Sequence, residues 1–321
     1  MPAATTDNIL ILPRIARPDP ATAKFRPVKK VVTAPTQLEG EGFQVRRAFP
    51  NADFRDSGPF LLLDHLGAVE YAPGEAKGAP WHPHRGFETA TYIIDGAFEH
   101  HDSTGGGGLI ANGSTQWMTA GGGILHDEVP TEKLIMEGGL FHGVQLWVNL
   151  PRELKMTPPR YQDIDADKVK LLSSDDGATI VRLVAGEIDG HQGAGVTWTP
   201  ITYVHATLTP GSRLQLPWNP EYNALVYALN GSGKVGLEGV DFKEGQLVVL
   251  GGGDAISVEA NARQDDRSPN LDVLVLGGRP IREPVVFYGP FVMNTREEVY
   301  QAMTDYHAGR LGQIPAEWLR K

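Results

Sequence analysis

Two short histidine-containing segments of the chain could together hold a metal ion. Residues 80–84 read Pro-Trp-His-Pro-His, and residues 126–128 read His-Asp-Glu. In an extended strand the side chains at positions i and i+2 point to the same face, so each segment presents a pair of groups that can bind a metal. Two adjacent strands would bring the pairs together. The spacing therefore predicts a metal site made of His82, His84, His126 and Glu128.

The donor set limits which metal such a site could take. Three neutral imidazoles and one carboxylate suit a borderline divalent cation. Iron(II), manganese, nickel or copper would keep one or two positions open for water, oxygen or substrate, whereas a closed set of four ligands would suit a structural zinc. The carboxylate has two candidates. Glu88 lies four residues after His84 and would share its face on a regular strand, so it competes with Glu128 as the fourth ligand.

An internal repeat separates the scaffold from the site. The motif at 80–84 is echoed by Pro-Trp-Asn-Pro-Glu at 217–221, and the triple glycine at 121–123 recurs at 251–253. A repeat of this kind predicts one fold used twice. In the second copy the four ligand positions are expected to hold Asn219, Glu221, Ile256 and Val258. These residues cannot form the same site, so we expect metal in the first copy alone.

The elements that position these residues are expected to be strands. Short segments rich in β-branched and aromatic residues, broken by Gly, Pro, Asn and Asp, predict an all-β sandwich or barrel. A single helix is expected after the N-cap Thr295, with Glu298 completing a capping box and Gly309 as the stop. The expected strands are Val31–Thr33, Gln44–Ala48, Phe60–Leu63, Thr89–Ile94, Ala97–His101, Gln116–Thr119, Gly143–Asn149, Val169–Leu172, Thr179–Leu183, Thr202–Leu208, Leu225–Leu229, Gln246–Leu250, Ala255–Glu259 and Leu271–Leu276.

These elements divide the chain into four parts. Residues 1–28 lack a sustained period and are expected to form an irregular arm, with a short extended piece at Ile9–Leu12. Residues 29–158 form the expected metal-binding domain, and a proline-rich linker at Leu150–Pro159 leads into a metal-free domain at 159–293. The helix and tail occupy 294–321.

Composition excludes several classes of function. The 321 residues are enough for two domains, and the net charge of −10 argues against direct binding of nucleic acid. The chain has no cysteine, which excludes disulfides, thiolate metal sites and cysteine nucleophiles and is compatible with a reducing compartment. No apolar run is long enough for a signal peptide or a membrane span. We therefore expect a soluble cytoplasmic protein that does not bind a membrane.

Five motifs of the sequence carry a resemblance to a known family. They are His82-Pro-His-Arg-Gly-Phe-Glu-Thr89, Gln116-Trp-Met-Thr-Ala-Gly121, Gly123-Ile-Leu-His126 with Glu128, Gly143-Val-Gln-Leu-Trp-Val-Asn149 and Tyr288-Gly-Pro-Phe-Val-Met-Asn-Thr295. With these motifs the sequence resembles the pirin family of the cupin superfamily, from about Lys30 almost to the C-terminus. The resemblance implies a bicupin, with two antiparallel β-barrels face to face, metal in the first barrel and a C-terminal helix.

The resemblance also implies a ligand set and a choice of functions. Carried over residue by residue, the family's metal ligands fall on His82, His84, His126 and Glu128, so the resemblance favours Glu128 over Glu88. The metal that it implies is iron(II). One implied function is a quercetin 2,3-dioxygenase that cleaves quercetin or a related aromatic with O2, in which Glu128 is both ligand and catalytic base. The alternative is a non-enzymatic, redox-sensitive iron protein that acts through a regulatory protein partner.

An aromatic substrate would need a largely apolar pocket beside the metal. The side chains expected to line it are Phe87, Trp117, Met118 and Trp147.

Overall fold

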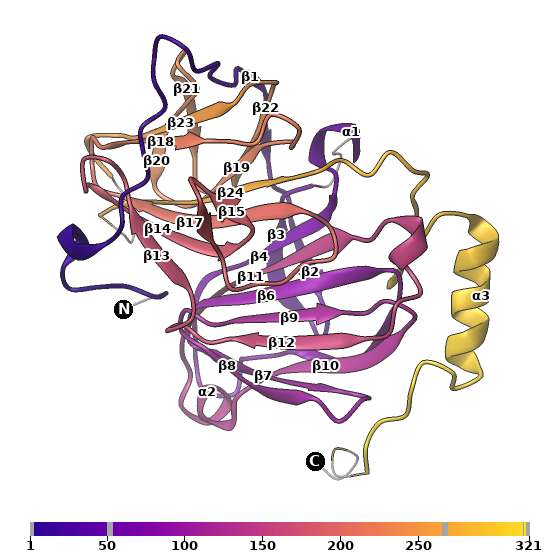
Figure 1. The fold of residues 1–321 in the computed structure, drawn as a ribbon. Helices are drawn as coiled ribbons and strands as arrows, with labels where there is room; N and C mark the ends of the chain where they lie inside the picture. The colour runs from indigo at the N-terminus through magenta and orange to yellow at the C-terminus, as the bar shows by residue number, and fades with distance from the viewer. Residues whose placement is uncertain (1–2, 50–53, 265–268, 317, 319–321) are drawn as a thin grey trace.

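The computed structural model describes residues 3–49, 54–264, 269–316 and 318, and two seven-stranded antiparallel sheets dominate it (Figure 1). The predicted all-β class is confirmed. The N-terminal sheet has the strand order β12-β9-β6-β11-β4-β3-β2. Its strands are β2 (Thr36–Glu39), β3 (Phe43–Arg47), β4 (Phe60–Tyr71), β6 (Phe87–Asp95), β9 (Thr115–Thr119), β11 (Gly139–Asn149) and β12 (Arg160–Ile164).

The second large sheet, the C-terminal sheet, repeats this plan. Its strand order is β1-β22-β19-β24-β17-β14-β13, and every pair of neighbours is antiparallel. All fourteen strands predicted from the sequence correspond to strands of the structure, most of them longer than predicted. The strands of this sheet are β1 (Val28–Thr33), β13 (Lys170–Ser173), β14 (Thr179–Ala185), β17 (Ile201–Leu208), β19 (Leu225–Asn230), β22 (Gln246–Leu250) and β24 (Leu271–Gly278).

Each half also has a four-stranded sheet, ordered β5-β10-β7-β8 in the first half and β18-β23-β20-β21 in the second. In the second half, apolar side chains from both sheets form one core, so the half is a two-layer sandwich. The sheets are open, whereas the resemblance implied closed barrels. The strands of the small sheets are β5 (Ala79–His84), β7 (Ala97–Asp102), β8 (Gly107–Ala111), β10 (Ile124–Pro130), β18 (Arg213–Pro217), β20 (Ser232–Val235), β21 (Val240–Lys243) and β23 (Ala255–Ala260).

The two large sheets share a buried core at the junction of the halves. Two matching hydrogen bonds cross this junction. The hydroxyl of Tyr92 on β6 lies 2.9 Å from Nδ1 of His205 on β17, and the hydroxyl of Tyr227 on β19 lies 3.1 Å from Nδ1 of His65 on β4. Because all four side chains are fully or almost fully buried, each bond satisfies polar groups that water cannot reach.

Two strands cross between the halves. β1 precedes the N-terminal sheet in the chain but pairs with β22 of the C-terminal sheet, and β12 follows the proline-rich linker but pairs with β9 of the N-terminal sheet. Each half therefore contains one strand from the other side of the expected domain boundary. The division at residue 158 stays a prediction.

The helices and four short strands lie outside the four larger sheets, and the short strands pair as β15-β16 and β25-β26. α3 (Arg296–His307) stands beside the N-terminal half (Figure 1), and both hydrogen bonds of its predicted capping box, between Thr295 and Glu298, are present. Among the described residues, no helix has the length and apolar character needed to span a membrane. The remaining elements are η1 (Ile9–Ile11), α1 (Phe54–Ser57), α2 (Glu132–Glu137), η2 (Arg152–Leu154), β15 (Glu187–Ile188), β16 (His191–Gln192), β25 (Val286–Tyr288) and β26 (Phe291–Met293).

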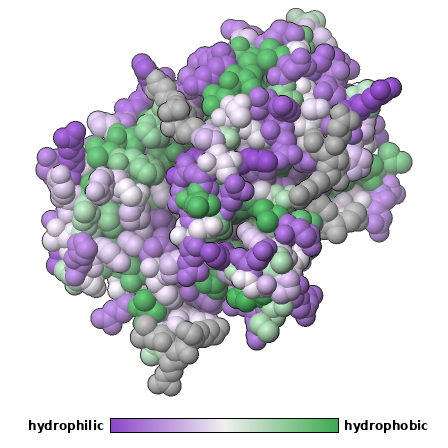
Figure 2. Space-filling view, turned by 180° about the vertical axis from the view of Figure 1, so that it is seen from behind, coloured by the Kyte–Doolittle hydropathy of each residue, from purple (hydrophilic) through white to green (hydrophobic). Residues whose placement is uncertain are grey.

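The N-terminal arm runs along the C-terminal half. Buried Arg26 anchors it by donating to the carbonyls of Gly251, Asn219 and Tyr222 at 2.8–3.0 Å. The extended piece predicted at Ile9–Leu12 is wrong: η1 is a 3₁₀ turn capped by the side chain of Asn8. Seen from behind, the surface is mostly hydrophilic, and apolar residues form separate patches (Figure 2).

The internal repeat holds in the fold but not in the predicted register. β18 ends at Pro217, and Asn219 and Glu221 lie exposed in the turn that follows. The residue that pairs with Ile256 is Leu216, as His82 pairs with His126 in the first half. Apolar side chains from this strand pair belong to the core of the second half, which explains why that copy folds without ligand groups.

Candidate metal centre

Three imidazoles converge where β5 and β10 pair. His126 lies directly opposite His82 in the antiparallel register, and His84 lies two residues further along the same face of β5. One ring nitrogen of each histidine lies within 4.8 Å of those of the other two. Within the described residues this is the one group of three or more side chains suited to a metal ion. The structure thus brings together three of the four residues predicted from the spacing.

The outer nitrogen of each ring is already engaged. Nδ1 of His82 lies 2.8 Å from the carbonyl of Pro80, and Nδ1 of His84 lies 3.3 Å from the carbonyl of Pro290 in the β25–β26 hairpin. A carbonyl can only accept, so in both rings the proton belongs on Nδ1 and the lone pair on Nε2. Nδ1 of His126 lies 2.8 Å from Nε2 of His100.

The inner nitrogens face one another. Nε2 of His82 and Nε2 of His84 are 3.1 Å apart, and neither can donate once its proton is on Nδ1. Nε2 of His126 is buried without a hydrogen-bond partner among the described residues. Two lone pairs at this separation repel unless a proton or a cation lies between them, and a buried unpaired nitrogen is costly. The residues present therefore fit a bound cation.

Burial keeps the imidazoles of His84 and His126 neutral. Removal from water lowers the pKa of His84 and of His126 well below the ordinary value, and the neighbouring His82 lowers both further. Burial also lowers the pKa of His100 to about 3. Because a metal binds the neutral imidazole, the site is ready to bind near neutral pH.

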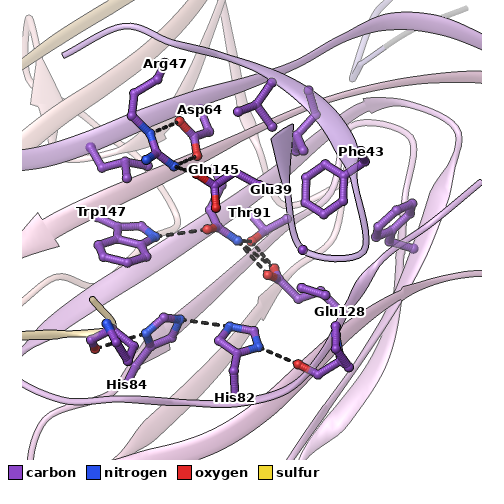
Figure 3. Close-up of a pocket in the computed structure, with 18 of the residues that line it drawn as sticks. Glu39, Phe43, Arg47, Asp64, His82, His84, Thr91, Glu128, Gln145 and Trp147 are labelled. Carbon is purple, nitrogen blue, oxygen red and sulfur yellow. Dashed lines mark hydrogen bonds and ion pairs between the residues drawn. The ribbon is translucent and has the colours of Figure 1, made fainter. Parts of the chain in front are cut away.

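The fourth predicted ligand, Glu128, lies in the same cavity but outside the three-imidazole group. Its carboxylate accepts from the hydroxyl of Thr91 at 2.8 Å and from Nε2 of Gln145 at 2.9 and 2.7 Å (Figure 3). The indole of Trp147 donates to Oε1 of Gln145 at 2.9 Å, which fixes the amide with its NH₂ toward the carboxylate. The register between β10 and β5 shifts after His126, so the simple i, i+2 relation to the histidines is interrupted.

Glu88 faces away from the imidazoles. β5 ends at His84, and the chain turns at Gly86, whose φ of +92° and close approach to the carbonyl of Val292 suit glycine. The turn places Glu88 in the other sheet, where its buried carboxylate accepts from the hydroxyl of Thr119 at 2.7 Å. The expectation that Glu88 shares a face with His84 is wrong, because it assumed one unbroken strand.

A cavity of about 490 Å³ opens beside the imidazoles, within the usual range for small-molecule sites. Of the four side chains expected to line it, Trp147 does so, and Phe87 stacks behind Trp147 with ring centroids 4.3 Å apart. Trp117 and Met118 belong to other buried clusters. Aromatic rings in the wall include Phe43, Trp81, Phe98, Phe141, Trp147 and Phe287.

Several site residues were missed from the sequence. Gln145 had a usable signal, since it lies two residues before Trp147 and shares its face. His100 and His101 face opposite sides of β7: His100 contacts His126, and Nδ1 of His101 lies 2.8 Å from Asp127. The pairing of β7 with β10 determines that His100, and not His101, lies beside the site. The sequence alone did not reveal this pairing.

The fold and the three-imidazole group define a two-domain protein of the cupin class. Family models match both halves: Pirin at residues 42–148 and Pirin C-terminal cupin domain at residues 203–312. The chain belongs to the pirin family.

Named relatives agree with this assignment. A pirin-like protein of Solanum lycopersicum is 40% identical over 92% of this chain and 97% of its own length. Human pirin is 37% identical over 86% of this chain and 90% of its own. The crystal structure of a quercetin 2,3-dioxygenase from Acinetobacter baumannii superposes with a TM-score of 0.83 at 35% identity, covering 91% of this chain and all of that one.

Proposed function

We propose that this protein is a metal-dependent dioxygenase that cleaves the heterocycle of quercetin or a related flavonol with O2. The observation that carries the proposal is the set of three imidazoles whose inner nitrogens face one another beside a cavity walled by aromatic rings. The similarity to a protein named quercetin 2,3-dioxygenase supports the choice of reaction.

In this proposal the three imidazoles and Glu128 hold one divalent cation, iron(II) as the family resemblance implies. The cation would act as a Lewis acid that lowers the pKa of a substrate hydroxyl and brings substrate and O2 together. His82, His84 and His126 offer Nε2, and their Nδ1 contacts keep the rings oriented toward the cation.

Glu128 is the proposed proton acceptor. The carboxylate would take the proton of the flavonol 3-hydroxyl, which would leave the substrate as an electron-rich enolate that can react with O2. Thr91 and Gln145 already donate to this carboxylate, so it has a fixed position whether or not it contacts the cation. Trp147 keeps the Gln145 amide in the required orientation and lines the cavity that would take the substrate ring.

The test is oxygen uptake by iron-loaded protein supplied with quercetin under conditions where free iron gives no uptake. We expect uptake that depends on quercetin and falls at least about 100-fold in Glu128→Gln, because general acid–base catalysis contributes roughly 10²–10⁴-fold. The matched control is His307→Ala on the exposed end of α3, which should retain full activity. Protein with one iron per chain and no uptake would refute the proposed reaction.

A further inference from the structure

The end of the cavity remote from the imidazoles is built from an ion-pair cluster of Glu39, Arg47 and Asp64 (Figure 3). Arg47 forms a two-point contact with Asp64, with Nε 2.8 Å from Oδ1 and Nη2 2.6 Å from Oδ2. The same Nη2 lies 2.7 Å from Oε1 of Glu39. The cluster comes from three strands, β2, β3 and β4, whose pairing holds it rigidly against the cavity wall.

Two carboxylates against one guanidinium leave the cluster with a net charge of −1. Asp64 is buried, and a charge that is removed from water interacts strongly with its neighbours. Gln37 and Arg47 both donate to Oε1 of Glu39, so within the described contacts Oε2 is left as an acceptor. This end of the cavity therefore offers hydrogen-bond acceptors and repels anions.

The space between the cluster and the imidazoles is apolar on both sides. Figure 3 shows Phe43 on one side and Trp147 on the other, with Gln145 and Glu128 between the cluster and His82. Aromatic walls of this kind favour a flat ring system as the ligand, because aromatic rings stack on each other. The cavity has three carboxylates and one guanidinium, so a divalent cation would bring its net charge to zero.

We infer that the cavity selects an uncharged polyhydroxylated aromatic, whose outer hydroxyls donate to the Glu39–Arg47–Asp64 cluster, and that it rejects a ligand with a carboxylate at that end. The inference rests on the proposed function, because that function places the metal-binding hydroxyl of the ligand at the imidazoles and so sets the orientation of the ligand. Glu39 is the specificity-determining residue, because it gives the cluster its excess negative charge and its available acceptor.

The test measures binding to zinc-loaded protein in the absence of oxygen, so that no turnover occurs. Three probes share one skeleton: quercetin, 3-hydroxyflavone, and 3-hydroxyflavone with a carboxylate on its pendant ring. We expect quercetin to bind about tenfold more tightly than 3-hydroxyflavone, the size of one hydrogen bond to a charged acceptor. The carboxylate probe should bind more weakly than 3-hydroxyflavone by a further factor of about ten or more.

The variant Glu39→Gln removes one negative charge. In this variant the affinities of quercetin and of the carboxylate probe should each lie within about threefold of the affinity of 3-hydroxyflavone. Glu41→Gln is the matched control. Glu41 lies exposed on the same hairpin and outside the cavity, so this substitution removes one negative charge without changing the cavity wall. Equal melting temperatures for both variants establish that the hairpin is intact. The inference is overturned if the carboxylate probe binds as tightly as quercetin, if no probe binds, or if Glu39→Gln leaves the selectivity of the wild type.

Oxygen uptake by the iron-loaded protein is recorded separately. Selective binding without oxygen uptake would refute the proposed reaction and leave the inference about the ligand standing. Oxygen uptake without selective binding would refute the inference and leave the proposed reaction standing.

Discussion

Replacing His100 should weaken metal binding, although His100 is not one of the proposed metal ligands. His100 and His126 are both fully buried, and 2.8 Å separates Nε2 of the first from Nδ1 of the second. If His126 presents the lone pair of Nε2 to a cation, its Nδ1 carries a proton that only His100 accepts among the described residues. The variant His100→Phe keeps the ring volume and the stacking on Tyr161, where the ring centroids are 5.5 Å apart, and removes the acceptor.

The structure sets the size of the effect. The substitution leaves a buried N–H of His126 unpaired, which costs roughly 1–3 kcal/mol, or about 5- to 150-fold in an equilibrium constant. Loss of an outer partner of a ligand typically weakens metal binding by about 10- to 100-fold. We therefore expect His100→Phe to raise the dissociation constant for zinc by about 10- to 100-fold.

The assay is a chelator competition that measures this dissociation constant, with the melting temperature of the metal-free protein recorded beside it. The matched control is His101→Phe at the next position, whose side chain faces Asp127 and Trp318 on the opposite side of the strand. Its zinc affinity should stay within about twofold of the wild type. The reasoning is refuted if His100→Phe binds zinc like the wild type, or if His101→Phe weakens binding equally.

Three further predictions concern stability. Burial lowers the pKa of His65 well below that of the unfolded chain, so the unfolded state binds more protons below about pH 6.5 and stability falls there as the pH falls. Buried His84, His100 and His126 act in the same direction, so in urea unfolding the pH slope of His65→Gln should be shallower than that of the wild type by up to about 1.4 kcal/mol per pH unit. Lys155→Met should lower the unfolding free energy by about 3 kcal/mol or more in the same assay, because buried Nζ donates to three acceptors at 2.7–2.9 Å; an effect below about 1 kcal/mol contradicts this. Asp305→Asn should lower the melting temperature and weaken zinc binding, because Asp305 pairs at 2.8 Å with buried Arg85, the residue after His84; unchanged zinc affinity would show that this ion pair does not position the ligand strand.

The strands could be predicted because local chemistry decides them. Alternating apolar residues and turn residues located every strand of the two large sheets except β2 and β12. The strands missed elsewhere, such as β8, β20 and β21, are four or five residues long and rich in glycine or charge, so they lack a clear apolar pattern. The exchange of β1 and β12 between halves could not be predicted, since it depends on pairing with residues far away in the chain.

In the candidate site, too, the features set by local sequence could be predicted, and those set by tertiary pairing could not. The three histidines were accessible from the sequence because i, i+2 spacing on a strand is a local property. The position of Glu128 depends on the register shift between β10 and β5, which no local signal specified. The carbonyl of Pro290 and the pair of Arg47 with Asp64 come from distant segments, so tertiary structure alone reveals them.

The central claim, that three imidazoles and Glu128 hold a divalent cation, is tested most directly by the metal content of the protein. Elemental analysis after loading with iron(II) and removal of excess metal under anaerobic conditions should find about one ion per chain in the wild type and less than about one tenth of that in His126→Ala, with circular dichroism showing that the variant is folded. Equal metal in the wild type and in the folded variant, or none in the wild type, would contradict the account.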